Sequence, residues 1–308
     1  MFRINFAPIS LSVAQIALCL SALNLAFCSS VQAQELDSSD SVPEESVSGI
    51  GDVNIYPRRV TIADRQRTAV VTLFNRTTND GSYDIDLIDM VMTPQGQLVE
   101  VSDADPALAA KLKSARDYIR YSPRRTTLDG NASQVIRLMA RSMATLPPGE
   151  YRTHFNATSR PRSSDGLTID DAVGGTRGEG ISVNISARFG IAIPVIVRVG
   201  ETTLDVGLSN ASLSTLNGDP VLSFDINRSG TRSAYGDVEV LLNDRTEPVL
   251  VSRGIGVYPE IDRRTVFMPL EQVFADHQMK SGDTLTVRYV DDDERIGTTL
   301  AQTELQIP

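Results

Sequence analysis

The stretch ISVNISARFGIAIPV, residues 181–195, decides the fold of this chain. Apolar side chains stand at every second position from Ile181 to Ile193, with polar residues or glycine between them up to Gly190. This period of two predicts a β-strand with one apolar face, longer than an average strand. Residues 160–180 precede it, are rich in Gly, Ser, Asp and Arg, and indicate a loop. A long apolar strand edge beside a polar loop invites pairing with another chain.

Further strand patterns fill the N-terminal half and are separated by turn-forming stretches such as NDGS, TPQGQ and LPPG. One segment, residues 103–120, breaks this pattern. Asp105 and Pro106 form an N-cap and first helical residue, and apolar residues follow at helical spacing: Leu108, Leu112, Ala115 and Ile119. We expect a short helix inserted in a β domain.

From about residue 200 the chain reads as seven short strands with turns at regular intervals, which is typical of a second β-sandwich. The expected fold is mostly β, with two immunoglobulin-like β-sandwich domains and the short helix in the first. The expected domains are residues 51–198, which carry the alternating strand, and residues 199–308.

The N-terminus reads as a targeting segment. Arg3 is followed by an uncharged apolar stretch and by Val31-Gln32-Ala33, so residues 1–33 are expected to be a signal peptide cleaved after Ala33. Residues 34–50 are acidic and rich in Ser, and we expect a disordered leader there. Both cysteines, Cys19 and Cys28, lie in the signal, so the exported chain is expected to have no disulfide.

Composition argues against several classes of function. A formal charge of −10 disfavours nucleic acids and anionic membranes as partners. His154 and His277 are the only histidines, His154 in a strand and His277 in a surface loop or helical turn, so we expect neither a metal site nor a catalytic triad. The acidic stretch Asp291–Arg295 lacks the ligand spacing of a calcium loop and is expected to be a solvated hairpin turn. No enzyme and no cofactor is expected.

Five segments in order carry a resemblance to a known family: NIYPRRVTI, TAVVTLFN, SPRRTTLDGNASQVIRL, LPPGEYRTHF, and the long loop with its alternating strand. Together they resemble the periplasmic chaperones of chaperone–usher pilus assembly, as a divergent member with a long loop. The resemblance implies strand addition to a subunit that lacks its last strand. Residues 181–193 would be the donated strand, and its inserted row would be Ile181, Val183, Ile185, Ala187 and Phe189.

The resemblance also implies two basic residues that anchor the carboxylate of the subunit. Arg59, before Val60, matches one of them, while its neighbour Arg58 is expected to point to the opposite face. A guanidinium fork suits a carboxylate. The family's lysine has Gly190 in its place, and Arg188, on the same strand face, is the second candidate. The family's commonest members also lack the inserted segment, whose role the sequence leaves open.

The function implied is a periplasmic chaperone that binds pilus or fimbrial subunits and delivers them to an outer-membrane usher, without inserting into a membrane. A self-capped dimer of the free protein is left open. The alternatives are an exported fibre subunit or adhesin, which would need an apolar N-terminal extension, and an immunoglobulin-like binding module. The absence of Trp gives no sign of the aromatic platform that a module of this kind usually has.

Overall fold

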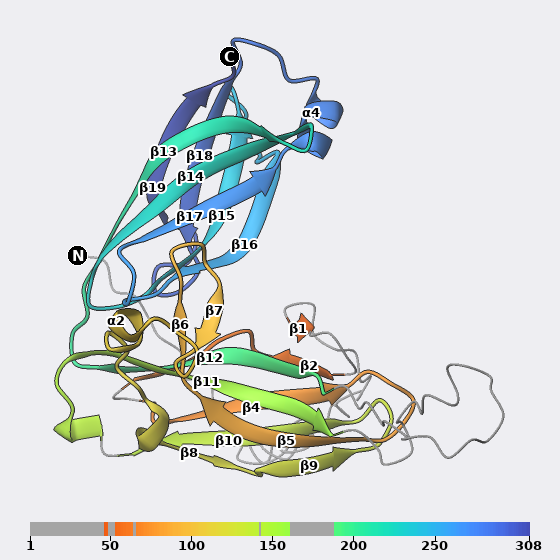
Figure 1. The fold of residues 1–308 in the computed structure, drawn as a ribbon, viewed down its shortest axis with the longest axis vertical. Coiled ribbons are helices and arrows are strands. Elements are labelled where there is room, and N and C mark those ends of the chain that lie inside the picture. Colours follow the sequence, from red (N-terminus) through yellow and green to blue (C-terminus); the bar gives the residue numbers. More distant parts are fainter. Residues whose placement is uncertain (1–45, 49–52, 64–65, 142, 161–187) are drawn as a thin grey trace, which may run out of the picture. The chain divides into compact units, whose positions relative to one another are not determined.

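The computed structural model describes residues 46–48, 53–63, 66–141, 143–160 and 188–308. Within them the chain is mostly β and forms two β-sandwiches of immunoglobulin-like type (Figure 1). The expected fold class is confirmed. The expected signal peptide, most of the expected acidic leader and the expected donated strand up to Ala187 lie outside the described residues.

In the described part, the first sandwich packs two five-stranded sheets face to face. One sheet has, in spatial order, β1 (Val47–Ser48), β2 (Val53–Tyr56), β4 (Thr68–Asn75), β10 (Ser133–Ala140) and β8 (Ile119–Ser122). The other has β3 (Val60–Ala63), β12 (Gly190–Val199), β11 (Gly149–Arg160), β5 (Gly81–Ile88) and β9 (Arg125–Leu128). All pairs are antiparallel except β3 with β12, which is parallel.

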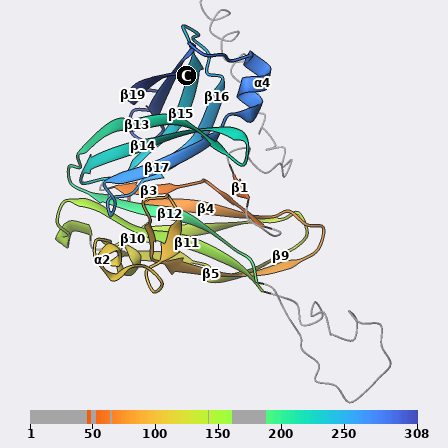
Figure 2. The ribbon, with the colours of Figure 1, turned by 45° about the horizontal axis from the view of Figure 1, so that its top comes forward.

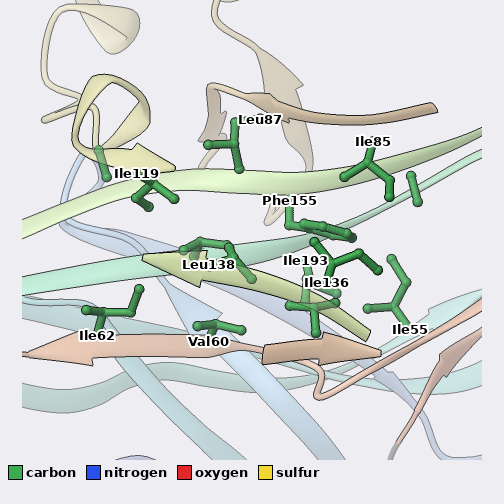
Figure 3. Close-up of a cluster of buried hydrophobic side chains, with 14 of the residues drawn as sticks. Ile55, Val60, Ile62, Ile85, Leu87, Ile119, Ile136, Leu138, Phe155 and Ile193 are labelled. Carbon is green, nitrogen blue, oxygen red and sulfur yellow. The ribbon is translucent and has the colours of Figure 1, made fainter. Parts of the chain in front are cut away.

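Alternate residues of these strands build the core between the two sheets, as strand periodicity requires. Figure 3 shows Phe155 of β11 and Ile193 of β12 among side chains of the facing sheet, such as Ile55 and Leu138. Ile191 and Ile193 are both buried in this core. The apolar row seen in the sequence is thus, over its last residues, part of the protein's own interior.

The second sandwich begins at β13, and its described part has seven strands, as expected (Figure 2). One sheet contains β13 (Leu204–Leu216), β14 (Asp219–Gly230) and β17 (Arg263–Pro269). The other contains β16 (Leu250–Val257), β15 (Ala234–Leu242), β18 (Thr284–Asp291) and β19 (Thr299–Gln306). Helix α4 (Glu271–His277) follows β17.

The inserted segment forms a much shorter helix than its spacing suggests. Helix α2 spans only Pro106–Ala109, with Asp105 accepting backbone hydrogen bonds as its N-cap, as the sequence indicates. A 3₁₀ turn at Arg116–Tyr118 then leads into β8; another occurs at Met143–Thr145. The backbone of Lys113 and Ala115 pairs with Arg152 of β11 at 2.8 and 3.0 Å, and these long-range bonds end the helix. Ala115 and Ile119 therefore serve the first core, not a helix face.

A hairpin of β6 (Met90–Met92) and β7 (Leu98–Glu100) extends from the first sandwich (Figure 1). The side chain of Met92 belongs to the core of the second sandwich, and the Thr265 N–H donates to the Pro94 carbonyl at 2.9 Å. Leu108 of α2 packs against the same core. The hairpin and the inserted helix thus both connect the first sandwich to the second.

Candidate functional site

Strand β12 presents a partly open backbone edge. It pairs with β11 along its full length, Gly190 to Val199, but with β3 only from Val195 to Arg198. Within the described residues, Gly190–Pro194 has no ladder partner on the side away from β11. Pro194, which has no N–H, is tolerated where an edge is unpaired.

Phe189 marks the point where the apolar row leaves the core of the first sandwich. Its backbone still bonds to Ser159 of β11, at 2.7 and 3.0 Å, but the residue is 43% exposed, whereas Ile191 is 6% exposed. The row therefore changes from exposed to buried at the start of β12. Its other candidate members lie outside the described residues: Ile181, Val183, Ile185 and Ala187.

After Pro194, strand β12 is buried on both faces. Val195 and Val197 point into the first core, whereas Ile196 belongs to the core of the second sandwich. Arg198, on the same face as Ile196, enters a cluster of ion pairs. This double burial explains why the alternation seen up to residue 190 becomes a continuous apolar run.

Arg59 lies in a cleft of about 630 Å³ to which both sandwiches contribute. Its Nη2 donates to the Asp292 carboxylate at 3.0 Å and to the Asp292 carbonyl at 2.9 Å. The guanidinium also lies over the ring of Tyr235, 4.1 Å from its centroid, which is cation–π geometry. The Asp293 carboxylate is 4.0 Å away. Arg59 is thus held on two sides.

Burial and the ion pair between Arg59 and Asp292 shift the pKa of both residues. Burial works to lower the pKa of Arg59, but Asp292, Tyr235 and Asp293 together outweigh it, and the pKa is raised. Burial raises the pKa of Asp292, and the attraction of Arg59 does not fully offset this, with Asp237 and Asp293 nearby adding repulsion. The arginine is a permanent cation, and Asp292 carries its charge at a cost.

Three more arginines line the cleft: Arg58, Arg253 and Arg264. None of these three has an ion pair among the described residues. Arg58 was expected to face away from Arg59, and that expectation is wrong. Residues 57–59 lie in a bend between β2 and β3, so strand alternation does not apply, and Arg58 lies beside Gly254.

The second candidate, Arg188, is in a different place. Its Nη2 lies 3.4 Å from the Asp84 carboxylate of β5, which Arg125 and Arg160 also contact. A hydrogen bond from Arg125, with the charges of the three arginines, lowers the pKa of Asp84. Arg188 therefore belongs to an exposed cluster outside the cleft, and the structure does not bring it together with Arg59.

Pro194, not Gly190, is the residue of β12 that lines the cleft with Arg59. Val195 pairs with Val60 in the parallel ladder, which places Pro194 beside Arg59. Gly190 pairs instead with Thr158, near the start of β12. Gly190 and Pro194 are four residues apart in an extended strand, which corresponds to roughly 13 Å.

Sequence reasoning missed the role of the acidic turn between β18 and β19. The turn was expected to be solvated, but Asp291 is buried and caps the turn by accepting from the N–H groups of Asp293 and Arg295, at 2.8 and 3.0 Å. Asp293 lies 2.5 Å from Arg198 and 3.2 Å from Arg232. The turn therefore binds arginines of both sandwiches. The four consecutive acids of the turn, Asp291 to Glu294, were the available signal.

A second buried group of charges lies next to this turn. Glu150 of β11 accepts from Arg198 at 3.3 Å and from the Ser233 N–H at 3.1 Å. Arg152 of the same strand forms an ion pair with Glu260 of the second sandwich, and both side chains are fully buried. Its guanidinium lies 3.7 Å from the centre of the Tyr258 ring. Charges buried at this depth are stable only as pairs.

The two histidines lie in the kinds of element that the sequence indicates, but His154 was expected to be half-buried and is more deeply buried than that. His154 lies in β11 and is fully buried, 6.1 Å from the Tyr258 ring, and neither of its ring nitrogens has a hydrogen-bond partner in the described part. His277 ends helix α4 and contacts Arg245 at the surface. Among the described residues, no group of three or more His, Cys, Asp or Glu could hold a metal ion, and no helix is long and apolar enough to cross a membrane.

Comparisons with known proteins find similar solved structures, at low sequence identity. No family model matches the chain, and no curated protein matches it in sequence. Solved structures that are similar include the YadV chaperone, at 12% identity over 83% of this chain and 100% of that chain, with a TM-score of 0.40. The CupB2 chaperone of Pseudomonas aeruginosa has 11% identity, with 82% and 100% coverage and a TM-score of 0.40. A CsuC–CsuE chaperone–tip subunit complex of Acinetobacter baumannii has 12% identity, with 85% and 98% coverage and a TM-score of 0.38.

Proposed function

We propose that this protein is a periplasmic chaperone that binds fimbrial subunits by donating the strand at residues 181–193 and then delivers them to an outer-membrane usher. The observation that carries the proposal is the open edge of β12 at Gly190–Pro194, with Phe189 leaving the core beside it. Backbone bonds along this edge would supply affinity, and alternate apolar side chains would fill the gap in the core of the subunit.

The arginine cleft is the proposed anchor for the C-terminal carboxylate of the subunit. Arg59 is a cation in the wall of this cleft, and Arg58, Arg253 and Arg264 of the same wall add positive charge. A guanidinium binds a carboxylate through charge-assisted hydrogen bonds, which are stronger than neutral ones. Arg188 is left out of this anchor because it contacts Asp84 in another cluster.

Export is part of the same proposal. Residues 1–33 would direct the chain through the inner membrane and be removed after Ala33, leaving the acidic leader at residues 34–50. The free protein would cover its apolar strand in a self-capped dimer, since an exposed edge of this kind promotes aggregation. The proposal needs no cofactor, because the energy for subunit release would come from the subunit completing its fold with another strand.

An immunoglobulin-like binding module is the second candidate, and the cleft of about 630 Å³ is what favours it, because small-molecule sites have volumes in this range. A module of that kind would use the cleft alone and would not depend on residues 181–193. A fibre subunit or adhesin would instead donate an N-terminal extension, and the acidic residues 34–50 do not have the required apolar alternation.

The test is a pull-down of the tagged protein from the periplasm of its native host, beside a variant with Val183→Asp and Ile185→Asp. We expect small β-rich subunits to be recovered with the unmodified protein and lost with the variant. Each buried aliphatic side chain would contribute about 1.5–3 kcal/mol, so two charges in the row are enough to prevent binding.

The matched control adds the same two charges elsewhere, as Val70→Asp and Val135→Asp. Both valines are about half exposed on the outer face of the β4–β10 pair. This control is expected to keep the subunits. If the strand variant is folded and recovers the same partners as the unmodified protein, strand donation is wrong and the binding-module function becomes the better one.

A further inference from the structure

We infer that Asp292 is a built-in competitor for Arg59, which lowers the affinity of the cleft for a peptide carboxylate. This inference rests on the proposed function, in which Arg59 receives the C-terminal carboxylate of a subunit. In the structure the Nη2 of Arg59 already donates to an oxygen of the Asp292 carboxylate at 3.0 Å. A second carboxylate would have to displace Asp292 or bind beside its negative charge.

The position of Asp292 is fixed by the turn that carries it. Asp291 accepts from two backbone N–H groups of the turn, and the Asp291 N–H donates to the Thr298 carbonyl at 2.8 Å. Asp293 and Glu294 are each paired with both Arg198 and Arg232. These seven contacts around it hold Asp292 against Arg59, and its pairing with Arg59 is part of the fold.

The same geometry shows how the competitor can leave. Asp292 is 29% exposed in its side chain and lies at the wall of the cleft, whereas Asp293 is 7% exposed and deeper. In the part of the chain that the structure describes, the Asp292 carboxylate forms an ion pair with Arg59 and with no other residue, so its side chain can rotate away while the rest of the turn keeps its pairs. A carboxylate that enters the cleft would then take its place on the guanidinium.

Binding of a short fluorescein-labelled peptide of alternating valine and threonine tests this inference. The peptide is used with a free C-terminal carboxylate and, separately, with a C-terminal amide, and fluorescence anisotropy measures the affinity of the full chain. Asp292→Asn keeps the shape of the side chain and removes its charge. We expect it to bind the carboxylate peptide about tenfold more tightly, with little change for the amide, because a charge-assisted bond is freed.

Asp237→Asn is the matched control. Asp237 lines the same cleft and accepts from the Gly254 N–H at 2.9 Å, but it has no hydrogen bond to Arg59. Asp237→Asn removes the same charge as Asp292→Asn. If both variants gain the same affinity for the carboxylate peptide, the gain comes from net charge and the inference is overturned. Arg59→Gln combined with Asp292→Asn is expected to lose the gain.

The remaining outcomes separate the inference from the proposed function. If the unmodified protein prefers the carboxylate peptide through Arg59 but Asp292→Asn changes nothing, the inference is wrong and the anchor stands. If neither protein distinguishes carboxylate from amide, the anchor itself is wrong, and the inference falls with it. Thermal unfolding followed by circular dichroism confirms that each variant is folded.

Discussion

At the scale of a single residue, His154 makes the stability of the protein depend on pH. Burial, with a smaller contribution from the charge of Arg152, lowers the pKa of His154 from 6.5 to about 3. The folded protein therefore resists protonation, so the stabilisation is fully present above pH 6.5 and is lost as the pH falls toward 3. Between pH 7 and pH 5 the protein should lose about 2 kcal/mol through this residue.

His154→Phe should remove this part of the pH dependence, as measured by urea unfolding at pH 7 and pH 5. The expected result is a smaller loss of unfolding free energy on acidification than in the unmodified protein, whatever the absolute stability. His277→Gln is the control, because His277 is on the surface next to Arg245. If His154→Phe and the unmodified protein lose the same free energy of unfolding between pH 7 and pH 5, the prediction is contradicted.

At the scale of an element, the β6–β7 hairpin depends on Gly96. Gly96 has a φ of +81°, and a Cβ on it would lie 2.2–2.6 Å from three atoms of the Arg264 side chain. Its N–H closes the turn on the Thr93 carbonyl at 2.8 Å. Gly96→Ala should therefore cost about 1–3 kcal/mol for the backbone conformation, and more for moving Arg264 from the Gly256 carbonyl.

Gly282→Ala gives the comparison for this change. Gly282 has a similar φ of +91°, but nothing lies within 4 Å of the position of a Cβ. Gly282→Ala should lose only the unfolding free energy that the strained backbone conformation costs. The difference between the two variants in urea unfolding therefore measures the contact with Arg264. Equal losses would mean that the hairpin can move away from Arg264 without cost.

The elements also show what the sequence could predict. The strands of the second sandwich were predictable because each has alternating residues and ends in turn-forming residues, both of which are local signals. The length of α2 was not, because the backbone that ends it pairs with Arg152, some forty residues away along the chain. The same limit applies to strand residues. Ile196 is apolar because the second sandwich covers it, and no local pattern in the sequence indicates that contact.

The candidate site, too, could be predicted from the sequence only in part. Arg59 and the apolar row of residues 181–193 could be proposed from local sequence and a family resemblance. The partner of Arg59 could not, since Asp292 is brought to it only by the contact between the two sandwiches. The neighbour of Arg59 on β12 also depends on a parallel register, Val195 with Val60, which the two separate stretches of sequence do not specify.

At the scale of the whole molecule, the ion pair of Arg152 and Glu260 joins the first sandwich to the second. Glu260 also accepts from the Met92 N–H of the hairpin at 3.0 Å, and the Glu260 carbonyl accepts from Lys111 at 3.2 Å. Because both side chains are buried, removing one partner leaves an uncompensated charge in the interior. Glu260→Ala should therefore lower the free energy of unfolding by about 3–5 kcal/mol.

Replacing both partners separates a charge effect from a loss of packing. Arg152→Leu with Glu260→Leu leaves no unpaired charge, so it should recover most of the stability lost in Glu260→Ala, except for the Met92 N–H, which keeps no acceptor. Glu239→Ala is the control. It removes the half-buried partner of Arg288, 2.8 Å away in the second sandwich, and should cost less than about 1 kcal/mol. Urea unfolding of all three variants measures these differences. If the double variant is no more stable than Glu260→Ala, the two sandwiches are joined by packing around the pair and the unpaired charge is not what destabilises the single variant.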